Sequence, residues 1–164
     1  DLVIEQCRED IISLPMPKFL SWRTHRLFPA GPPPATFLYT TYDNPAFARD
    51  VRWRVWESAT VTFVALQLAF HMGFQQVVLI GVDHSSAVPG KANTTIVSQG
   101  DDPNHFNPAY FGKGFRWQLP DFETSEIGYN LARDAYEKAG RQVLDATIGG
   151  KLTIFPKAEY LSLF

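Results

Sequence analysis

This sequence of 164 residues has little cysteine and few long apolar runs, and neither sign of charge is in large excess. The single cysteine, Cys7, cannot form a disulfide within the chain, so a reducing compartment such as the cytoplasm is expected. A net charge of -2 gives no electrostatic reason to expect nucleic acid or an anionic membrane as a partner. Gln67 and His71 interrupt the longest apolar run, so no transmembrane segment is predicted.

The sequence also lacks an initiator methionine and a signal peptide. Because it begins at Asp1, we expect it to be a piece of a longer protein, so the missing targeting signals carry little weight. The residues that are present, 45% of them hydrophobic and 20% charged, are typical of an ordinary globular protein. The length predicts a single domain over residues 1–164, large enough to bury a core.

The stretch V-V-L-I-G-V-D at residues 77–83 predicts a strand that is buried on both faces and central in its sheet, and Gly81 ends it. The preceding residues 58–72 are apolar almost all round, which predicts a buried helix ended by Gly73 and packed on that strand. The polar residues Asp83, His84 and Ser85 then follow the strand. They lie at its carboxyl end, where open α/β sheets place their ligands.

Further elements alternate along the chain without internal repeats, which indicates an α/β fold with a mostly parallel sheet. A long loop at residues 85–124 has little periodicity and is expected to be functional. The other predicted elements are helices over residues 2–14, 124–140 and 157–164, strands over 18–22, 36–42, 51–57 and 142–147, and a polyproline-like loop over 23–35.

Two groups of residues near the central strand have the chemistry of a binding site. Ser58 and Thr60 begin the apolar helix, where unpaired backbone N–H groups and hydroxyls suit a phosphate, although an ordinary helix cap explains them equally well. Asp83, His84 and Ser85 are suited to hold a substrate hydroxyl, a ribose or a metal, with a simple capped turn as the alternative.

The third group lies in the long loop, in the run N-H-F-N-P-A-Y-F-G-K-G at residues 104–114. His105 is a candidate general base because an imidazole transfers protons near neutral pH, and a loop can bring it to a substrate. Tyr110, Gly112 and Lys113 are further pocket candidates in the same run. A metal bound by Asp101, Asp102 and His105 is an alternative, but the spacing matches no specific metal motif.

Three runs carry a resemblance to a known family: S-A-T-V-T-F-V-A-L-Q-L-A-F-H-M-G-F-Q-Q-V-V-L-I-G-V-D-H, H-F-N-P-A-Y-F-G-K-G and V-L-D-A-T-I-G-G-K-L. Their order and spacing over residues 58–156 resemble the family called domain of unknown function 115. That family is similar to the sialyltransferases of glycosyltransferase family 42 and includes proteins like 6-hydroxymethylpterin diphosphokinase. The resemblance implies a three-layer Rossmann-like fold whose N-terminal part, with its glycine-rich nucleotide loop, is missing from this sequence.

The resemblance to family 42 also implies transfer of a sialic-acid type sugar from a nucleotide donor to an acceptor hydroxyl, without a metal or other cofactor. It assigns donor contacts to Ser58, Thr60 and Asp83, a phosphate contact to Tyr110 and the general base to His105. The partners would be the nucleotide sugar and a glycan or small-molecule acceptor. Two alternatives stay open: diphosphate transfer from ATP to a pterin, which requires Mg²⁺, and a nucleotide- or sugar-binding module without turnover.

Overall fold

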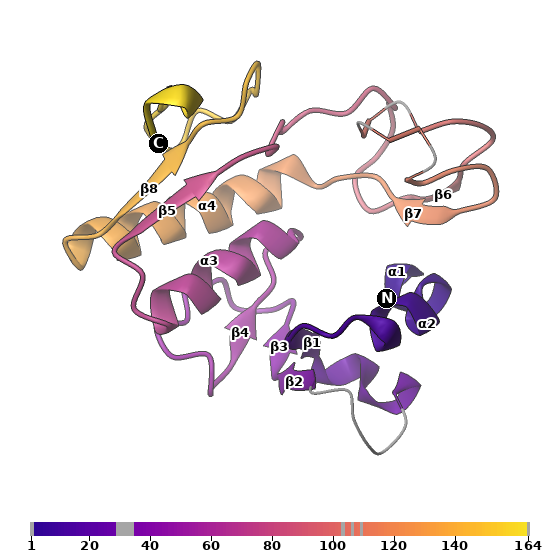
Figure 1. Ribbon diagram of the computed structural model, residues 1–164, viewed down its shortest axis with the longest axis horizontal. Helices are drawn as coiled ribbons and strands as arrows, with labels where there is room; N and C mark the ends of the chain where they lie inside the picture. Colours follow the sequence, from indigo (N-terminus) through magenta and orange to yellow (C-terminus); the bar gives the residue numbers. More distant parts are fainter. Residues whose placement is uncertain (1, 29–34, 103, 106, 109, 164) are drawn as a thin grey trace. The chain divides into compact units, whose positions relative to one another are not determined.

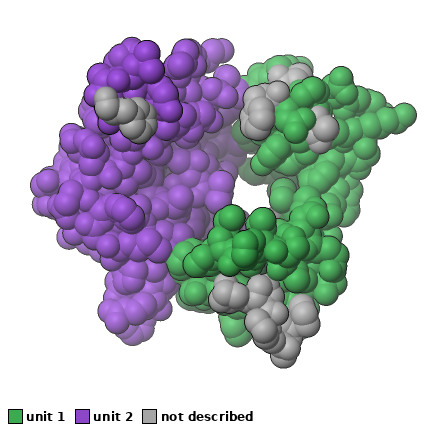
Figure 2. Space-filling model, in the orientation of Figure 1, with its two compact units in different colours: residues 1–40, 86–120 green, residues 41–85, 121–164 purple. Residues whose placement is uncertain are grey.

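The chain divides into two compact units (Figure 2). The computed structural model describes residues 2–28, 35–102, 104–105, 107–108 and 110–163. Unit 1 consists of residues 1–40 and 86–120, and unit 2 consists of residues 41–85 and 121–164. Each unit is therefore discontinuous in sequence, and the segment 86–120 of unit 1 is inserted between two parts of unit 2.

Unit 2 is built on the order helix, strand, helix, strand (Figure 1). These elements are α3 (Val61–His71), β5 (Gln76–Leu79), α4 (Phe122–Lys138) and β8 (Gln142–Asp145). β5 and β8 are parallel, with Gln76 opposite Gln142 and Leu79 opposite Asp145. Because α4 lies between them in sequence, they form a βαβ crossover, so the α/β class is confirmed. The described sheets are all two-stranded.

The two helices of unit 2 begin and end where the sequence supplies capping residues. The Thr60 hydroxyl accepts a hydrogen bond from the Thr62 amide at the start of α3, and the Asp121 carboxylate accepts one from the Thr124 amide at the start of α4. Gly73 follows α3 with a φ of +90°, a left-handed conformation that glycine adopts without steric cost. The predicted helices over 58–72 and 124–140 are thus confirmed with shifted ends.

The core of unit 2 is a cluster of apolar side chains from both helices and both strands. Phe63 and Tyr136 are fully buried in it, and the Tyr136 hydroxyl donates to the Leu66 carbonyl oxygen. Burial raises the pKa of Tyr136 to about 12. The cluster consists of Trp56, Phe63, Leu66, Phe70, Leu79, Tyr129, Ala132, Tyr136, Val143, Leu152 and Phe155.

The burial of β5 corrects one expectation. Val77 and Leu79 face the core, whereas Val78 is half-buried and Ile80 is 58% exposed. Among the described residues β5 has one neighbour, β8, so it is not a central strand and is not buried on both faces. The prediction was wrong because a continuous apolar run does not show whether one face of a strand or both are covered.

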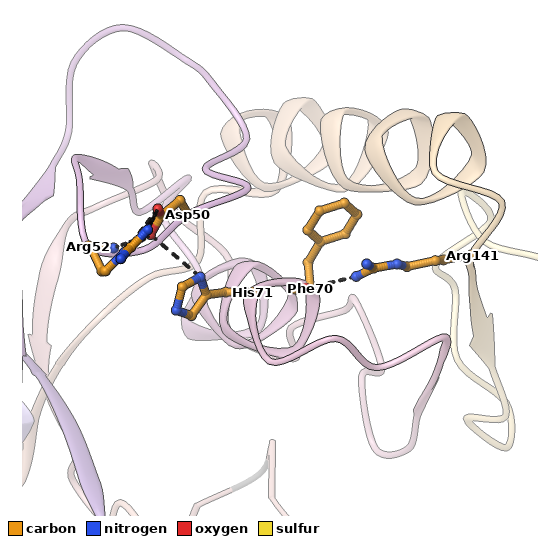
Figure 3. A network of polar contacts seen from close by, with 5 residues as sticks. All are labelled: Asp50, Arg52, Phe70, His71 and Arg141. Atoms are coloured by element: carbon orange, nitrogen blue, oxygen red, sulfur yellow. Dashed lines mark hydrogen bonds and ion pairs between the residues drawn. The ribbon is translucent and has the colours of Figure 1, made fainter.

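The α3 helix is likewise buried on one face only, because Phe63, Leu66, Gln67 and Phe70 point to the core while Val61 is 82% exposed. Its C-terminal turn is held from two sides (Figure 3). The Arg141 guanidinium donates to the Phe70 carbonyl oxygen and lies 4.3 Å from the Phe70 ring centroid. Nδ1 of His71 lies 3.5 Å from the Asp50 carboxylate.

Unit 1 has shorter elements. Two helices, α1 (Leu2–Gln6) and α2 (Arg8–Ser13), replace the single predicted helix over 2–14, with a break at Cys7. A strand, β1 (Lys18–Ser21), pairs in parallel with β2 (Ala35–Leu38), which confirms the strand predicted over 18–22. A 3-10 helix (Trp22–Leu27) follows β1. The proline run at 32–34, with its predicted polyproline character, lies outside the described residues.

The long loop of unit 1 contains an antiparallel hairpin that sequence periodicity did not predict. Its strands are β6 (Thr95–Val97) and β7 (Arg116–Gln118). The remaining elements are β3 (Thr40–Thr41), β4 (Val55–Trp56) and a 3-10 helix (Tyr160–Leu163). Because β4 has two residues, the strand predicted over 51–57 is much shorter than expected. No helix in the described part of the chain has the length and apolar character needed to cross a bilayer.

Candidate functional site

The carboxyl ends of β5 and β8 carry a shallow depression in unit 2. Its volume is about 270 Å³, and it is lined by Ile80, Gly81, Asp83, Ala146, Thr147, Ile148 and Tyr160. The exposed side chain of Asp83 is its acidic group. This is the edge of a parallel sheet at which α/β proteins bind ligands.

Hydrogen bonds fasten the two strand ends that form this depression. The Val82 amide donates to the Thr147 hydroxyl over 3.1 Å, and the Lys151 amide donates to the Asp83 carbonyl oxygen over 2.8 Å. At the end of β8, the fully buried Asp145 carboxylate accepts from the Thr147 amide and from the Lys157 ammonium group, the latter over 2.6 Å. The floor of the depression is therefore fixed by the fold.

The Asp145 carboxylate remains ionised despite its burial. Desolvation alone would raise its pKa, but the hydrogen bonds from Lys157 and Thr147 outweigh it and hold the pKa below the usual range. All these partners belong to unit 2, so this ion pair joins the end of β8 to the segment that follows it. It is a structural contact.

His84 is held against α4. Its side chain is 10% exposed, Nε2 lies 3.0 Å from the Glu126 carboxylate, and the ring meets the edges of Phe122 and Tyr129. Its backbone φ is +53°, which is uncommon for a residue other than glycine. Ser85 next to it is exposed and is the last residue before the inserted segment of unit 1.

Ser58 and Thr60 lie at the start of α3, but their hydroxyls have different surroundings. The Ser58 hydroxyl is buried and donates to the Thr124 carbonyl oxygen of α4 over 2.7 Å. The Thr60 hydroxyl caps α3 and lies 3.4 Å from the Tyr129 hydroxyl. In this structure the Ser58 hydroxyl is a link between two elements of the fold, whereas Thr60 lies closer to the surface.

Tyr129 connects two of the predicted groups, because both Thr60 and His84 contact it. Three residues in this region, Ser58, Ala59 and His84, have left-handed backbone conformations without being glycine. Such strain of about 1–3 kcal/mol per residue is concentrated at functional sites in proteins. Sequence reasoning did not single out Tyr129, because a tyrosine within a predicted amphipathic helix is typical of a core residue.

The third predicted group lies in unit 1 and is organised by Asp102. This carboxylate is 2% exposed and lies 2.6 Å from Nδ1 of His105. It also accepts hydrogen bonds from the amides of Asn104 and Phe111, over 2.8 and 3.1 Å. Burial alone would raise the pKa of Asp102, but these amides and the His105 ring together hold it below the usual range.

Aromatic rings surround the imidazole of His105. Tyr110 stacks on it with 4.3 Å between ring centroids, and Phe111 meets it edge-on at 5.1 Å. The His105 side chain is still 37% exposed, and no described residue bonds to its Nε2 atom. The imidazole is therefore fixed in orientation and open to a ligand.

Gly112 and Lys113 form the turn that leads into β7. The Gly112 carbonyl oxygen accepts from the Phe115 amide, and the amide of Gly114 donates to Ser98. Lys113 is exposed between them. Within the described part of the loop, neither residue is hydrogen-bonded to His105, so this turn belongs to the loop's own backbone and not to the surroundings of the imidazole.

The predicted site residues are divided between the units. Unit 2 contains Ser58, Thr60, Asp83, His84 and Ser85, and unit 1 contains His105, Tyr110, Gly112 and Lys113. Within the described ranges, no three His, Cys, Asp or Glu side chains gather as metal ligands, and Asp101 does not join the pair of Asp102 and His105. Searches of protein-family models, curated proteins and solved structures found no match to this chain.

Proposed function

We propose that this protein is a glycosyltransferase that moves a sialic-acid type sugar from a nucleotide donor to an acceptor hydroxyl. The observation that carries the proposal is the imidazole of His105, which is exposed, oriented through Nδ1 and backed by Tyr110. Transfer to a hydroxyl requires a group that takes its proton as the new bond forms, and a neutral imidazole is suited to this task near neutral pH.

The other three histidines are less suited to the role. His84 has little exposed surface, and His25 is stacked on Trp22 with its Nδ1 atom 2.6 Å from the Trp22 carbonyl oxygen. His71 lies beside Asp50 at the end of α3 (Figure 3). His105 is the histidine that combines exposure with an aromatic surrounding.

The donor would be held by groups at the start of α3 and the end of β5. The Asp83 side chain is exposed there, and the Thr60 hydroxyl, which also caps α3, lies close to the surface. Ser58 would act through the fold, since its hydroxyl is committed to Thr124. The phosphate contact of Tyr110 stays a prediction. The parallel βαβ arrangement of unit 2 supports a three-layer Rossmann-like domain, and the lone Cys7 supports a cytoplasmic location.

The first experiment is a transfer assay with cytidine-monophosphate sugars and glycan acceptors, followed by mass spectrometry of the products. We expect transfer that persists after a chelator is added. Phosphorylated pterin formed from ATP only with Mg²⁺ would contradict the proposal in favour of diphosphate transfer. Ligand-induced stabilisation without any product would favour a binding module.

The second experiment replaces the proposed general base, His105. His105→Ala should lower kcat by about 10²–10⁴-fold and leave donor affinity nearly intact, because the imidazole acts on the acceptor proton. His71→Ala is the matched control, since that side chain contacts Asp50 and no candidate site residue. Near-normal turnover of the His105 variant would exclude this assignment.

A further inference from the structure

The four histidines of the chain differ in what holds their rings. His71 and His84 face carboxylates that are 30% and 55% exposed, and His25 faces a backbone carbonyl oxygen. His105 alone among these described imidazoles has a carboxylate partner that is almost fully buried. A buried carboxylate interacts more strongly with a neighbouring imidazole than an exposed one does, because solvent screens the pair less.

The position of Asp102 is fixed by the loop itself. One of its carboxylate oxygens accepts from the Asn104 amide, and the other accepts from the Phe111 amide and faces Nδ1 of His105. The Asp102 amide also donates to the Pro108 carbonyl oxygen over 2.8 Å. The carboxylate therefore has one orientation, and its contact with the imidazole is set by backbone bonds on both sides.

This geometry determines which ring nitrogen of His105 carries the proton. The lowered pKa of Asp102 means that the carboxylate is ionised at neutral pH, and an ionised carboxylate only accepts hydrogen bonds. Nδ1, 2.6 Å away, must therefore be the protonated nitrogen. In the neutral ring Nε2 then has the free electron pair, and it is the nitrogen without a described partner.

We propose that Asp102 is the positioning residue of the general base: it fixes His105 with its Nε2 electron pair toward the acceptor. The proposal rests on the proposed function. As the acceptor oxygen bonds to the anomeric carbon, its proton passes to Nε2 and the bond from that carbon to the phosphate oxygen breaks. The nucleotide leaves with the electron pair, and the Asp102 carboxylate stabilises the imidazolium until its proton passes to solvent.

The first test measures the tautomer directly, without any assay of transfer. Long-range ¹H–¹⁵N NMR spectra of the protein at neutral pH should show His105 protonated at Nδ1 and unprotonated at Nε2. Asp102→Asn should shift the ring toward the other tautomer, because an amide can donate to Nδ1. Asp50→Asn, which changes the carboxylate beside His71, should leave the His105 signals unchanged.

The second test separates positioning from a merely structural role of Asp102. Asp102→Asn should lower kcat by about 10²–10⁴-fold with little change in the KM for the donor. In a His105→Ala background the same substitution should cause no further loss, because its effect passes through the imidazole. A further loss of similar size in that background would overturn the proposal and assign Asp102 to loop structure.

The two tests also separate this proposal from the proposed function. If the protein transfers no sugar but His105 shows the expected tautomer, the proposed reaction is wrong and the pair stands as a general-base device for another reaction. If the unaltered protein shows His105 protonated at Nε2, the positioning role of Asp102 is overturned whatever the assay gives. The NMR measurement on the unaltered protein needs no variant. It therefore tests the proposal even if Asp102→Asn does not fold.

Discussion

Unit 2 and unit 1 bury very different amounts of apolar surface. Every member of the apolar core cluster belongs to unit 2. Among the described residues of unit 1, the buried apolar side chains are Ile4, Leu38 and Leu119. The most buried carboxylates show a parallel difference: Asp145 in unit 2 is bound to a lysine of the fold, and Asp102 in unit 1 is bound to an exposed imidazole.

Stability and reactive groups therefore come from different units of this chain. In unit 2, polar side chains near the core form hydrogen bonds within the fold. The Ser58 hydroxyl and the Asp145 carboxylate are examples. In unit 1 aromatic stacking and backbone hydrogen bonds keep His105 in place while leaving it exposed. Binding and catalytic residues are often found on loops that a rigid scaffold supports.

The largest expected effect is on the core of unit 2. Phe63→Ala should lower the free energy of unfolding by about 3–5 kcal/mol, because the ring is fully buried and the cavity cannot refill. Phe115→Ala is the matched change in unit 1, where the ring is half-buried and stacks on Phe111. We expect about 1 kcal/mol there, measured by urea denaturation. Equal losses of stability for the two variants would contradict the view that unit 2 has the better packed core.

The next effect concerns the buried carboxylate of unit 2. Asp145→Asn should cost about 2–3 kcal/mol at pH 7, because the charge-assisted bond from Lys157 is lost. The folded-state pKa of Asp145 is depressed, so its stabilising contribution is present above about pH 3.8 and is lost as the pH falls through the folded value. The difference between variant and wild type should therefore shrink in denaturation curves recorded near pH 3. Asp134→Asn, which changes an exposed partner of Arg133, is the control and should behave like wild type at both pH values.

A smaller effect is expected at a tight contact between α4 and the turn that precedes α3 in unit 2. A Cβ atom on Gly128 would lie 2.1 Å from the Ser58 hydroxyl oxygen, so Gly128→Ala should cost about 1–3 kcal/mol through overpacking. Adding Ser58→Gly should recover part of this loss, because it removes the clashing atoms at a residue with a φ of +50°. Gly100→Ala is the counterpart in unit 1, where a Cβ meets nothing within 4 Å, and it should leave thermal unfolding nearly unchanged. A costly change at Gly100 would contradict the tighter packing of unit 2.

The smallest effect concerns the exposed surface of unit 2. The hydrogen bond from Arg52 is the main reason that the pKa of Asp50 is lowered to about 2, so Arg52→Met should raise it toward its ordinary value. An NMR titration of the Asp50 carboxyl would measure this shift. Figure 3 shows His71 beside the same carboxylate. His71→Ala should move the pKa of Asp50 less, since the charge of His71 has the smallest effect on that pKa. A larger change in the pKa of Asp50 for His71→Ala than for Arg52→Met would contradict the main role of the Arg52 hydrogen bond.

The elements that the sequence predicted well are those defined by local signals. The helix ends at Thr60, Gly73 and Gly140 follow from capping and left-handed residues, and β1 and β8 were expected within a few residues. The hairpin of β6 and β7 was missed because its pairing joins residues on either side of an irregular loop. The exposure of Ile80 was missed because burial depends on which elements cover a strand, which local composition does not contain.

For the candidate site, the sequence pointed to His105 but not to its partner. Asp102 was considered only as a metal ligand, since a carboxylate three residues before a histidine fits several roles. Its burial, and the two amides that orient it, depend on the fold of the loop around it. Ser58 shows the reverse case: its place before a helix suggested a ligand contact, and the backbone turn directs its hydroxyl to Thr124.

The discontinuity of unit 2 also affects the order in which the chain can fold during synthesis. β5 leaves the ribosome before the segment 86–120, whereas its partner β8 and the core residues Leu152 and Phe155 follow only after that whole segment. The apolar side of α3 therefore lacks the core residues of α4 and β8 until these elements have been made, and pairing of β5 with β8 must close a long loop. A nascent chain halted before residue 142 would expose that surface and would be a natural client for chaperones.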